Sequence, residues 1–456
     1  MALALVLPVL LAVIRLLPAT TAMSWFAHPW LAVLTYVPIS VAGMLIPRIS
    51  VAEKLMASGS IDASGNMKRF DWGSRWGAVA MYSFGAAVGT HLIPGNGFFS
   101  FIWACFLLAA NSLLKTIQAK FRRSSLLNFS LYALSLAVPI LISLYVGVML
   151  WQTLQEKMGM AGSIPHPFGF FVADIIMAAT SGYVVILALS PLIPVAGIWL
   201  ASSRIVLFLV SLSILGASVS PQFFPYNTYA PKRILLQRTF STQGQRILGA
   251  DYDLAVFDAN SLPFVFKNVE AVPKFLGLEP GFSWKTVSKS PSGTWMAIYP
   301  ISRLFVESYR FSAGNKVVLK DDQRLPHIIL QNVKEDILNP DRKRIYVEID
   351  MGSLHEVWAS VLNITGPLTS WSFSDERLPV PEVVNGGPPS YICRLSGKDT
   401  SENWKFWLEA NTSKPLQVDL AVLDHELDDD TRTLLHLFPS WAATIAGSTY
   451  LSSYLI

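Results

Sequence analysis

The stretch FGFFVADIIMAATSGYVVILALSPLIPVAGIWLASSRIVLFLVSLSILGA, residues 168–217, decides the fold of the first half of the chain. Its only charged residues are Asp174 and Arg204. A membrane-spanning helix needs about 20 mainly apolar residues. The stretch therefore predicts two spans, Phe168–Leu189 and Val195–Ala217. The sequence SPLIP between them (Ser190–Pro194) predicts a tight turn, because proline ends one helix and permits the next to begin.

The apolar character extends back to the N-terminus. Of the 35 basic and 31 acidic residues, 17 lie in Met1–Ser220 and 49 in Pro221–Ile456. We therefore predict a polytopic transmembrane domain in residues 1–220 and a polar domain in residues 221–456. Five further spans bring the number to seven: Ala2–Leu17, Trp30–Pro47, Trp76–Pro94, Phe98–Ile117 and Leu126–Trp151. The first could be read as a signal peptide, but it has no basic residue at its start, which favours a retained span.

The basic residues of the short loops predict the orientation of the spans. Lys115–Arg123 has four positive charges and no acidic residue, so we place this loop in the cytosol. The basic loop after Pro47 lies two spans earlier and hence on the same side. With seven spans, the polar domain then lies in the lumen. Two glycosylation sequons in that domain agree with this side of the membrane, at Asn363 and Asn411.

The polar domain is predicted to be an antiparallel β-sandwich. Apolar and polar residues alternate at period two in four segments, which Pro, Gly, Asn and Ser separate: Arg344–Gly352, Val357–Thr365, Lys405–Asn411 and Leu416–Glu426. Several short strands at this spacing are typical of a sandwich or a jelly roll. The net charge of +4 is too small to indicate nucleic-acid binding, and the two cysteines do not make a disulfide scaffold.

The stretch LDHELDDDTRTLLHLFPSW (Leu423–Trp441) has the composition of a metal site but not its spacing. A zincin helix needs H-E-x-x-H, and the residue four positions after His425 is Asp429. A calcium loop needs a glycine that is absent after Asp430. We therefore expect a strand that ends at Asp424, an acidic turn and a short helix over Thr431–Leu437. We predict no catalytic residue and no metal ligand in this chain.

Three segments resemble the endoplasmic-reticulum metallopeptidase family, also known as Felix-ina. The segment LHLFPSWAATIAGSTYLSSYLI resembles the end of these proteins, where a Phe-Pro-x-Trp element precedes a hydrophobic strand rich in Ser and Tyr. The segment PYNTYAPKRILLQRTF (Pro225–Phe240) resembles the start of the lumenal domain, and NWKFWLEAN (Asn403–Asn411) resembles its aromatic strand. The sequence departs from the family at Arg238, where many members have histidine.

The resemblance implies an endoplasmic-reticulum membrane protein with a lumenal C-terminal domain; a vacuolar or other endomembrane location is the alternative. Family members also have an N-terminal zinc exopeptidase domain, with a His-x-Asp element that this sequence lacks. We therefore expect no cofactor in this chain, since the zinc belongs to the missing domain. Either the sequence is truncated or it is a natural short form.

The membrane domain offers two further features. Ionisable residues inside a membrane are costly and usually pair, so we predict that Asp174 and Arg204 form an intramembrane pair. Interfacial positions for both residues, or a transport pathway, are the alternatives. Gly85 and Gly89 form a small-xxx-small face that permits close helix packing, more readily within the chain than in a dimer.

Three classes of function are open from the sequence. The chain is the membrane-anchoring and lumenal accessory portion of a zinc exopeptidase-like protein, a non-enzymatic lumenal binding or assembly protein, or a small transporter. A transporter would need more paired polar residues within the membrane than Asp174 and Arg204. The expected partners are membrane lipid and a lumenal protein or peptidase domain, and no nucleic acid.

Overall fold

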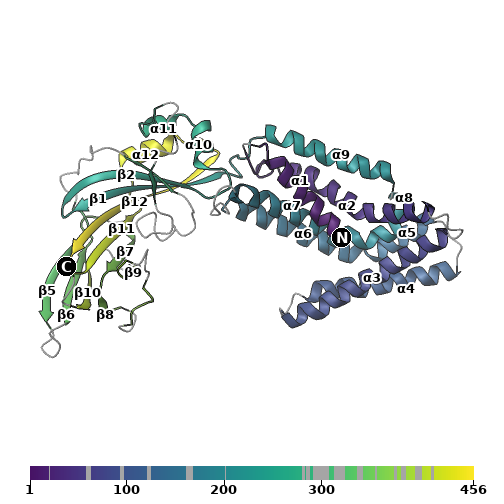
Figure 1. The fold of residues 1–456 in the computed structure, drawn as a ribbon, viewed down its shortest axis with the longest axis horizontal. Helices are drawn as coiled ribbons and strands as arrows, with labels where there is room; N and C mark the ends of the chain where they lie inside the picture. The colour runs from purple at the N-terminus through teal and green to yellow at the C-terminus, as the bar shows by residue number, and fades with distance from the viewer. Residues whose placement is uncertain are drawn as a thin grey trace. The chain divides into compact units, whose positions relative to one another are not determined.

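The computed structural model describes residues 1–19, 21–57, 63–92, 97–120, 125–160, 168–200, 202–279, 283, 288–290, 308–312, 324–335, 342–354, 357–373, 377–381, 387–395, 403–411 and 415–456. The chain forms two compact units (Figure 1). The first comprises Met1–Met158 and Pro167–Tyr226, and the second comprises Gly159–His166 and Asn227–Ile456.

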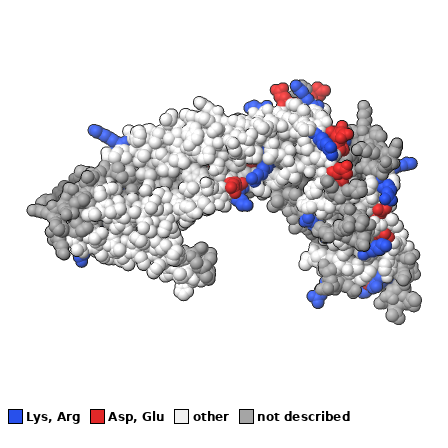
Figure 2. All heavy atoms as spheres, turned by 180° about the vertical axis from the view of Figure 1, so that it is seen from behind, with Lys and Arg blue, Asp and Glu red and all other residues white. Residues whose placement is uncertain are grey.

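The first unit is helical. Its helices, in chain order, are α1 (Ala2–Leu16), α2 (Pro29–Ala57), α3 (Ala63–Leu92), α4 (Gly97–Lys120), α5 (Ser125–Ser135), α6 (Ala137–Met158), α7 (Phe168–Leu189), α8 (Ile193–Leu200) and α9 (Ser203–Val219). Figure 2 shows few charged side chains over this unit and many over the second unit. A helical surface without charge is what a lipid environment requires.

Five helical stretches of the described chain are long and apolar enough to cross a membrane: Pro29–Lys54, Gly97–Thr116, Ala137–Met158, Phe168–Ala196 and Ser203–Gln222. The seven predicted spans are therefore reproduced only in part. Helix α1 has 15 residues, fewer than a span normally needs. Helix α3 carries Lys68, Arg69, Asp71 and Arg75 in its first half, which leaves a short apolar remainder.

The prediction for Ser190–Pro194 is confirmed only in part, because α7 ends at Leu189 as predicted but the span expected from Val195 to Ala217 does not begin there. Residues Ser190–Leu192 form one 3₁₀ turn that joins α7 directly to α8. Pro191 lies in the first turn of this short helix, and Pro194 lies in the first turn of α8, where the missing N–H of proline costs no hydrogen bond. The break falls instead at Ser202, which has an extended backbone and precedes α9.

Helix α1 packs closely against two longer helices. A Cβ atom at Gly43 of α2 would lie 2.7 Å from the carbonyl oxygen of Leu3. At Gly182 of α7 it would lie 2.6 Å from the carbonyl oxygen of Ala4. Any larger side chain at either position would push α1 away. Glycine thus lets the backbones approach each other, which is how helices associate within membranes.

The second unit contains two sheets. The eight-stranded sheet has the order β3-β4-β2-β1-β12-β11-β7-β9, and the four-stranded sheet has the order β5-β6-β10-β8. The strands are β1 (Lys232–Gln243), β2 (Arg246–Val256), β3 (Ser288–Ser290), β4 (Ser308–Ser312), β5 (His327–Glu335), β6 (Arg342–Asp350), β7 (Val357–Thr365), β8 (Leu368–Trp371), β9 (Ser390–Leu395), β10 (Trp404–Asn411), β11 (Gln417–Asp424) and β12 (Ala442–Leu455).

The four strands predicted from alternation are confirmed as β6, β7, β10 and β11. The prediction of a purely antiparallel sandwich needs a correction, because β1 and β12 pair in parallel, with Leu236 opposite Ala446. This pairing joins the first and last strands of the unit at the centre of the larger sheet. A tight turn cannot connect two parallel neighbours. The pairing of β1 with β12 therefore leaves no signal in the local sequence.

One face of the larger sheet is covered in two parts. Buried residues of β7, β11 and β12 pack with those of β6 and β10 to form the core between the sheets. Farther along the same face, Ile234, Leu236 and Leu254 pack against three short helices. These helices are α10 (Leu262–Asn268), α11 (Ala271–Phe275) and α12 (Asp429–His436).

Candidate functional site

The most developed polar site of the helical unit surrounds the Asp174 carboxylate. Nη2 of Arg15 donates to Oδ1 of Asp174 at 2.5 Å, and Nη1 of Arg15 donates to Oγ of Ser220 at 2.7 Å. The backbone N–H of Met23, the indole N–H of Trp25 and the hydroxyl of Tyr36 also donate to Asp174. The cluster therefore ties the end of α1, the start of α2, the start of α7 and the end of α9 together.

Burial makes this cluster energetically important. The Asp174 side chain is 0% exposed and that of Arg15 is 5% exposed. A charge in such an environment is tolerated only when it is paired and hydrogen-bonded. Met23 has a φ of 63°, a conformation that costs energy for a residue other than glycine. This strain is consistent with a loop that is held in place by the carboxylate.

The predicted pairing of Asp174 with Arg204 is not found. Arg204 is exposed in the first turn of α9, whereas Asp174 lies beside Ser220, which directly follows that helix. At 1.5 Å per residue, the 16 positions from Arg204 to Ser220 correspond to about 24 Å. The actual partner, Arg15, has the same sequence signal as Arg204, a single cation in an apolar run. Only the packing of α1 distinguishes the two.

A second ion pair lies toward the other end of α2. Both terminal nitrogens of the Arg48 guanidinium donate to Asp71 of α3, and Nη1 also donates to the carbonyl oxygen of Pro194 at 3.1 Å. Arg48 is 5% exposed. The pair joins α2, α3 and α8, and neither residue was identified in the sequence as a site because both lie in a predicted loop.

The acidic stretch of the C-terminal domain binds a cation of the chain itself. Asp428 is the residue before α12, and Oδ1 of Asp428 accepts a hydrogen bond from Thr431. Arg238 of β1 donates to Asp428 and, at 3.2 Å, to Asp430. The guanidinium is 3% exposed and lies over the rings of Phe240 and Tyr252. The predicted strand, acidic turn and helix are confirmed, with the helix beginning at Asp429 rather than Thr431.

These residues do not fit a zinc site. Among the described residues, no group of three or more His, Cys, Asp or Glu side chains is placed to hold a metal ion. Asp428 and Asp430 are already paired with Arg238, and His425 lies against the ring of Trp358, with 5.9 Å between the ring centroids. A metal would have to displace the guanidinium from these carboxylates.

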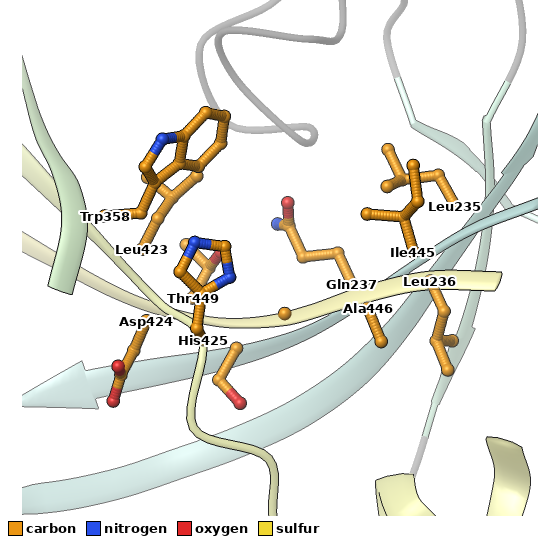
Figure 3. A pocket seen from close by; sticks show the side chains of 12 residues that line it. Leu235, Leu236, Gln237, Trp358, Leu423, Asp424, His425, Ile445, Ala446 and Thr449 are labelled. Atoms are coloured by element: carbon orange, nitrogen blue, oxygen red, sulfur yellow. The ribbon is translucent and has the colours of Figure 1, made fainter. Parts of the chain in front are cut away.

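His425 and Trp358 instead line a shallow hollow of about 60 Å³ on the face of the larger sheet opposite the core (Figure 3). Leu235, Leu423 and Ile445 supply apolar walls, and Gln237 also lines the hollow, with its amide nitrogen donating to Oγ1 of Thr239. This apolar lining gives a hollow suited to contact with a side chain rather than to catalysis.

Lys232, in the Pro-Lys-Arg segment, forms a fully buried ion pair in the C-terminal domain. Its Nζ donates to Oδ1 of Asp258 at 2.6 Å and to the carbonyl oxygen of Asn260 at 2.5 Å. Both side chains are 0% exposed. Burial lowers the pKa of Lys232 below its ordinary value, and the adjacent Asp258 carboxylate opposes this effect. The pair fixes the start of β1 to the loop after β2.

The two sequons lie in different environments. Asn411 ends β10 and is exposed, so a glycan is sterically acceptable there. Asn363 is 6% exposed within β7, where its amide nitrogen donates to Oδ2 of Asp419 at 3.1 Å and its carbonyl oxygen accepts from Ser390. The prediction of a glycan at Asn363 therefore conflicts with the fold, because the modified nitrogen is inside a hydrogen-bond network.

Of the two predicted packing glycines, Gly85 lies close to a neighbouring helix. A Cβ atom at Gly85 of α3 would lie 3.2 Å from Oγ of Ser100 in α4. This contact joins α3 and α4 of the same chain. Closer approaches to a neighbouring backbone occur at Gly43 and Gly182, which the sequence analysis did not single out.

Comparison with protein families gives one finding. Residues 229–454 match the family model described as endoplasmic reticulum metallopeptidase 1, C-terminal domain. The match covers nearly all of the second unit, including Lys232, Arg238 and the acidic turn. A comparison with curated proteins found no significant match.

Proposed function

We propose that the chain belongs to the endoplasmic reticulum metallopeptidase family, whose C-terminal-domain model matches residues 229–454, and that it is the membrane-anchoring and lumenal accessory portion of such a protein. The helical unit holds the C-terminal domain at the endoplasmic-reticulum membrane. The C-terminal domain supports a lumenal protein, with a peptidase domain as the preferred partner. The family match carries this proposal, and the geometry of the helical unit supports the lumenal side.

The helices alternate in direction. The ends of α1 and α9 and the start of α7 meet at Asp174, and Gln155 near the end of α6 donates to the carbonyl oxygen of Phe26 just before α2. At the opposite end, Arg48 in the second half of α2 meets Asp71 of α3 and Pro194 of α8. This alternation supports seven membrane crossings, namely the five longer spans together with α1 and α3.

Charge distinguishes the two ends of the helical unit, whereas aromatic residues mark both ends. The end that contains Arg48 also carries Lys54, Arg69, Arg75 and Lys115 in the adjoining helix turns. This excess favours the cytosol. Near Asp174, edge-to-face contacts link Phe223 with His28 and Trp30, and Trp72 and Trp76 lie together at the other end. Such aromatic groups mark the two membrane–water interfaces. The chain leaves the helical unit from the Asp174 end, which we place on the lumenal side.

We expect no peptidase activity from this chain. Catalytic zinc needs three protein ligands and an open position, and the acidic turn is occupied by Arg238. The purified chain should release no product from aminoacyl substrates in a chelator-sensitive manner, and His425→Ala should change at most its stability. Elemental analysis after dialysis is the independent readout. Stoichiometric zinc, together with hydrolysis abolished by His425→Ala, would contradict the proposal.

A further inference from the structure

A hollow of about 160 Å³ opens beside the Arg48–Asp71 pair, within the helical unit. Met44, Pro47, Phe70, Ala78 and Ile193 supply apolar walls, while Arg48, Ser74 and Ser190 supply polar atoms. A space with this mixture suits a ligand that has both a hydrocarbon part and a polar head. We infer that the hollow binds the phosphate headgroup of an anionic phospholipid, with the start of its acyl chains against the apolar wall.

The state of Arg48 points to an anion. Its two terminal nitrogens bind Asp71 and the carbonyl oxygen of Pro194, but its Nε–H lies buried without an acceptor. A buried donor without a partner destabilises the structure, because it has lost its hydrogen bonds to water. Arg48 is 5% exposed and lines the hollow. A phosphate oxygen that entered the hollow would supply the missing acceptor.

The charge around the hollow has the required sign. Asp71 neutralises Arg48 itself, but Arg75 lies close enough to act on the Asp71 carboxylate. Lys54 and Arg69 are exposed on the same end of α2 and α3, against Glu53. Juxtamembrane basic groups attract the anionic headgroups of a leaflet. The assignment to the cytosolic leaflet rests on the proposed orientation, whereas binding itself does not.

The test compares two serine-to-leucine variants on the same helix. Ser74→Leu places a larger side chain at the hollow and leaves the Arg48–Asp71 pair intact, while Ser83→Leu changes an exposed residue of α3. The purified chain in nanodiscs is titrated with fluorescent phosphatidic acid, and with diacylglycerol as the neutral lipid. We expect phosphatidic acid to bind wild type and Ser83→Leu equally, and Ser74→Leu about tenfold more weakly, equivalent to about 1.4 kcal/mol. Gel filtration confirms that each variant remains folded.

Competition with inorganic phosphate identifies the source of the anion. Displacement of the labelled lipid only by a lipid competitor supports the headgroup assignment. Displacement by millimolar inorganic phosphate would overturn it in favour of a site for free phosphate. Equal binding of diacylglycerol, or equal affinity of Ser74→Leu and wild type, would overturn the inference as well. Because the assay is independent of orientation, its failure would leave the proposed accessory function untouched.

Discussion

Replacement of Asp174 by leucine should lower the free energy of unfolding of the helical unit by about 3–5 kcal/mol, the usual cost of removing one partner of a buried ion pair. The change leaves the Arg15 guanidinium buried beside Ser220 and removes the acceptor for Met23, Trp25 and Tyr36. Reversible unfolding in mixed detergent micelles, followed by Trp fluorescence, measures the loss.

The double variant Arg15→Met, Asp174→Leu tests the pairing itself. Because an apolar pair of similar volume requires no desolvation of charge, the double variant should be more stable than Asp174→Leu alone. Arg204→Gln is the matched control, since Arg204 is exposed and far from the cluster. The assignment would be contradicted if the stability losses from Arg15→Met and Asp174→Leu simply added in the double variant. It would also be contradicted if Arg204→Gln lowered the stability as much as Asp174→Leu.

A comparable loss is expected in the C-terminal domain from Lys232→Met. The substitution leaves the Asp258 carboxylate buried without its cation, and its Oδ2 atom already lacks a partner. We expect a decrease of about 3–5 kcal/mol in the free energy of unfolding. The loss should appear as a lower denaturant midpoint in the far-ultraviolet circular dichroism of the β-sheet signal.

Arg233→Met provides the control for Lys232→Met. It removes the same charge from the adjacent position of β1, where the side chain is only partly buried. A decrease within about 0.5 kcal/mol is expected for such a site. If the two variants lost the same stability, the Lys232–Asp258 pair would not be what fixes the start of β1.

The residues that could be predicted from the sequence are those with local signals. Long apolar runs predicted the membrane helices, and period-two alternation predicted β6, β7, β10 and β11. The acidic segment after Asp424 predicted the turn and the helix that follows it. In each case the signal lies within the segment that forms the element.

What could not be predicted depends on contacts between distant segments. Arg15 and Arg204 look alike in sequence, and only the close passage of α1 over Gly43 and Gly182 brings Arg15 to Asp174. Asn363 has a complete sequon, but its burial arises from Asp419 and Ser390 on neighbouring strands. The parallel pairing of β1 with β12 likewise joins the two ends of a domain.

The central claim is that the helical unit anchors the C-terminal domain on the lumenal side of the membrane. Protease protection tests this claim most directly. The full chain is expressed in cells with one epitope at the C-terminus and another between α2 and α3, and sealed microsomes are treated with protease. The C-terminal epitope should survive until detergent is added, and the α2–α3 epitope should be lost at once.

Glycosylation provides the internal check of the same experiment. An endoglycosidase should shift the mass of the chain, and Asn411→Gln alone should abolish the shift, because Asn411 is exposed and Asn363 is buried. A C-terminal epitope that is digested in sealed microsomes, in a chain without an endoglycosidase-sensitive glycan, would place the domain in the cytosol and contradict the account.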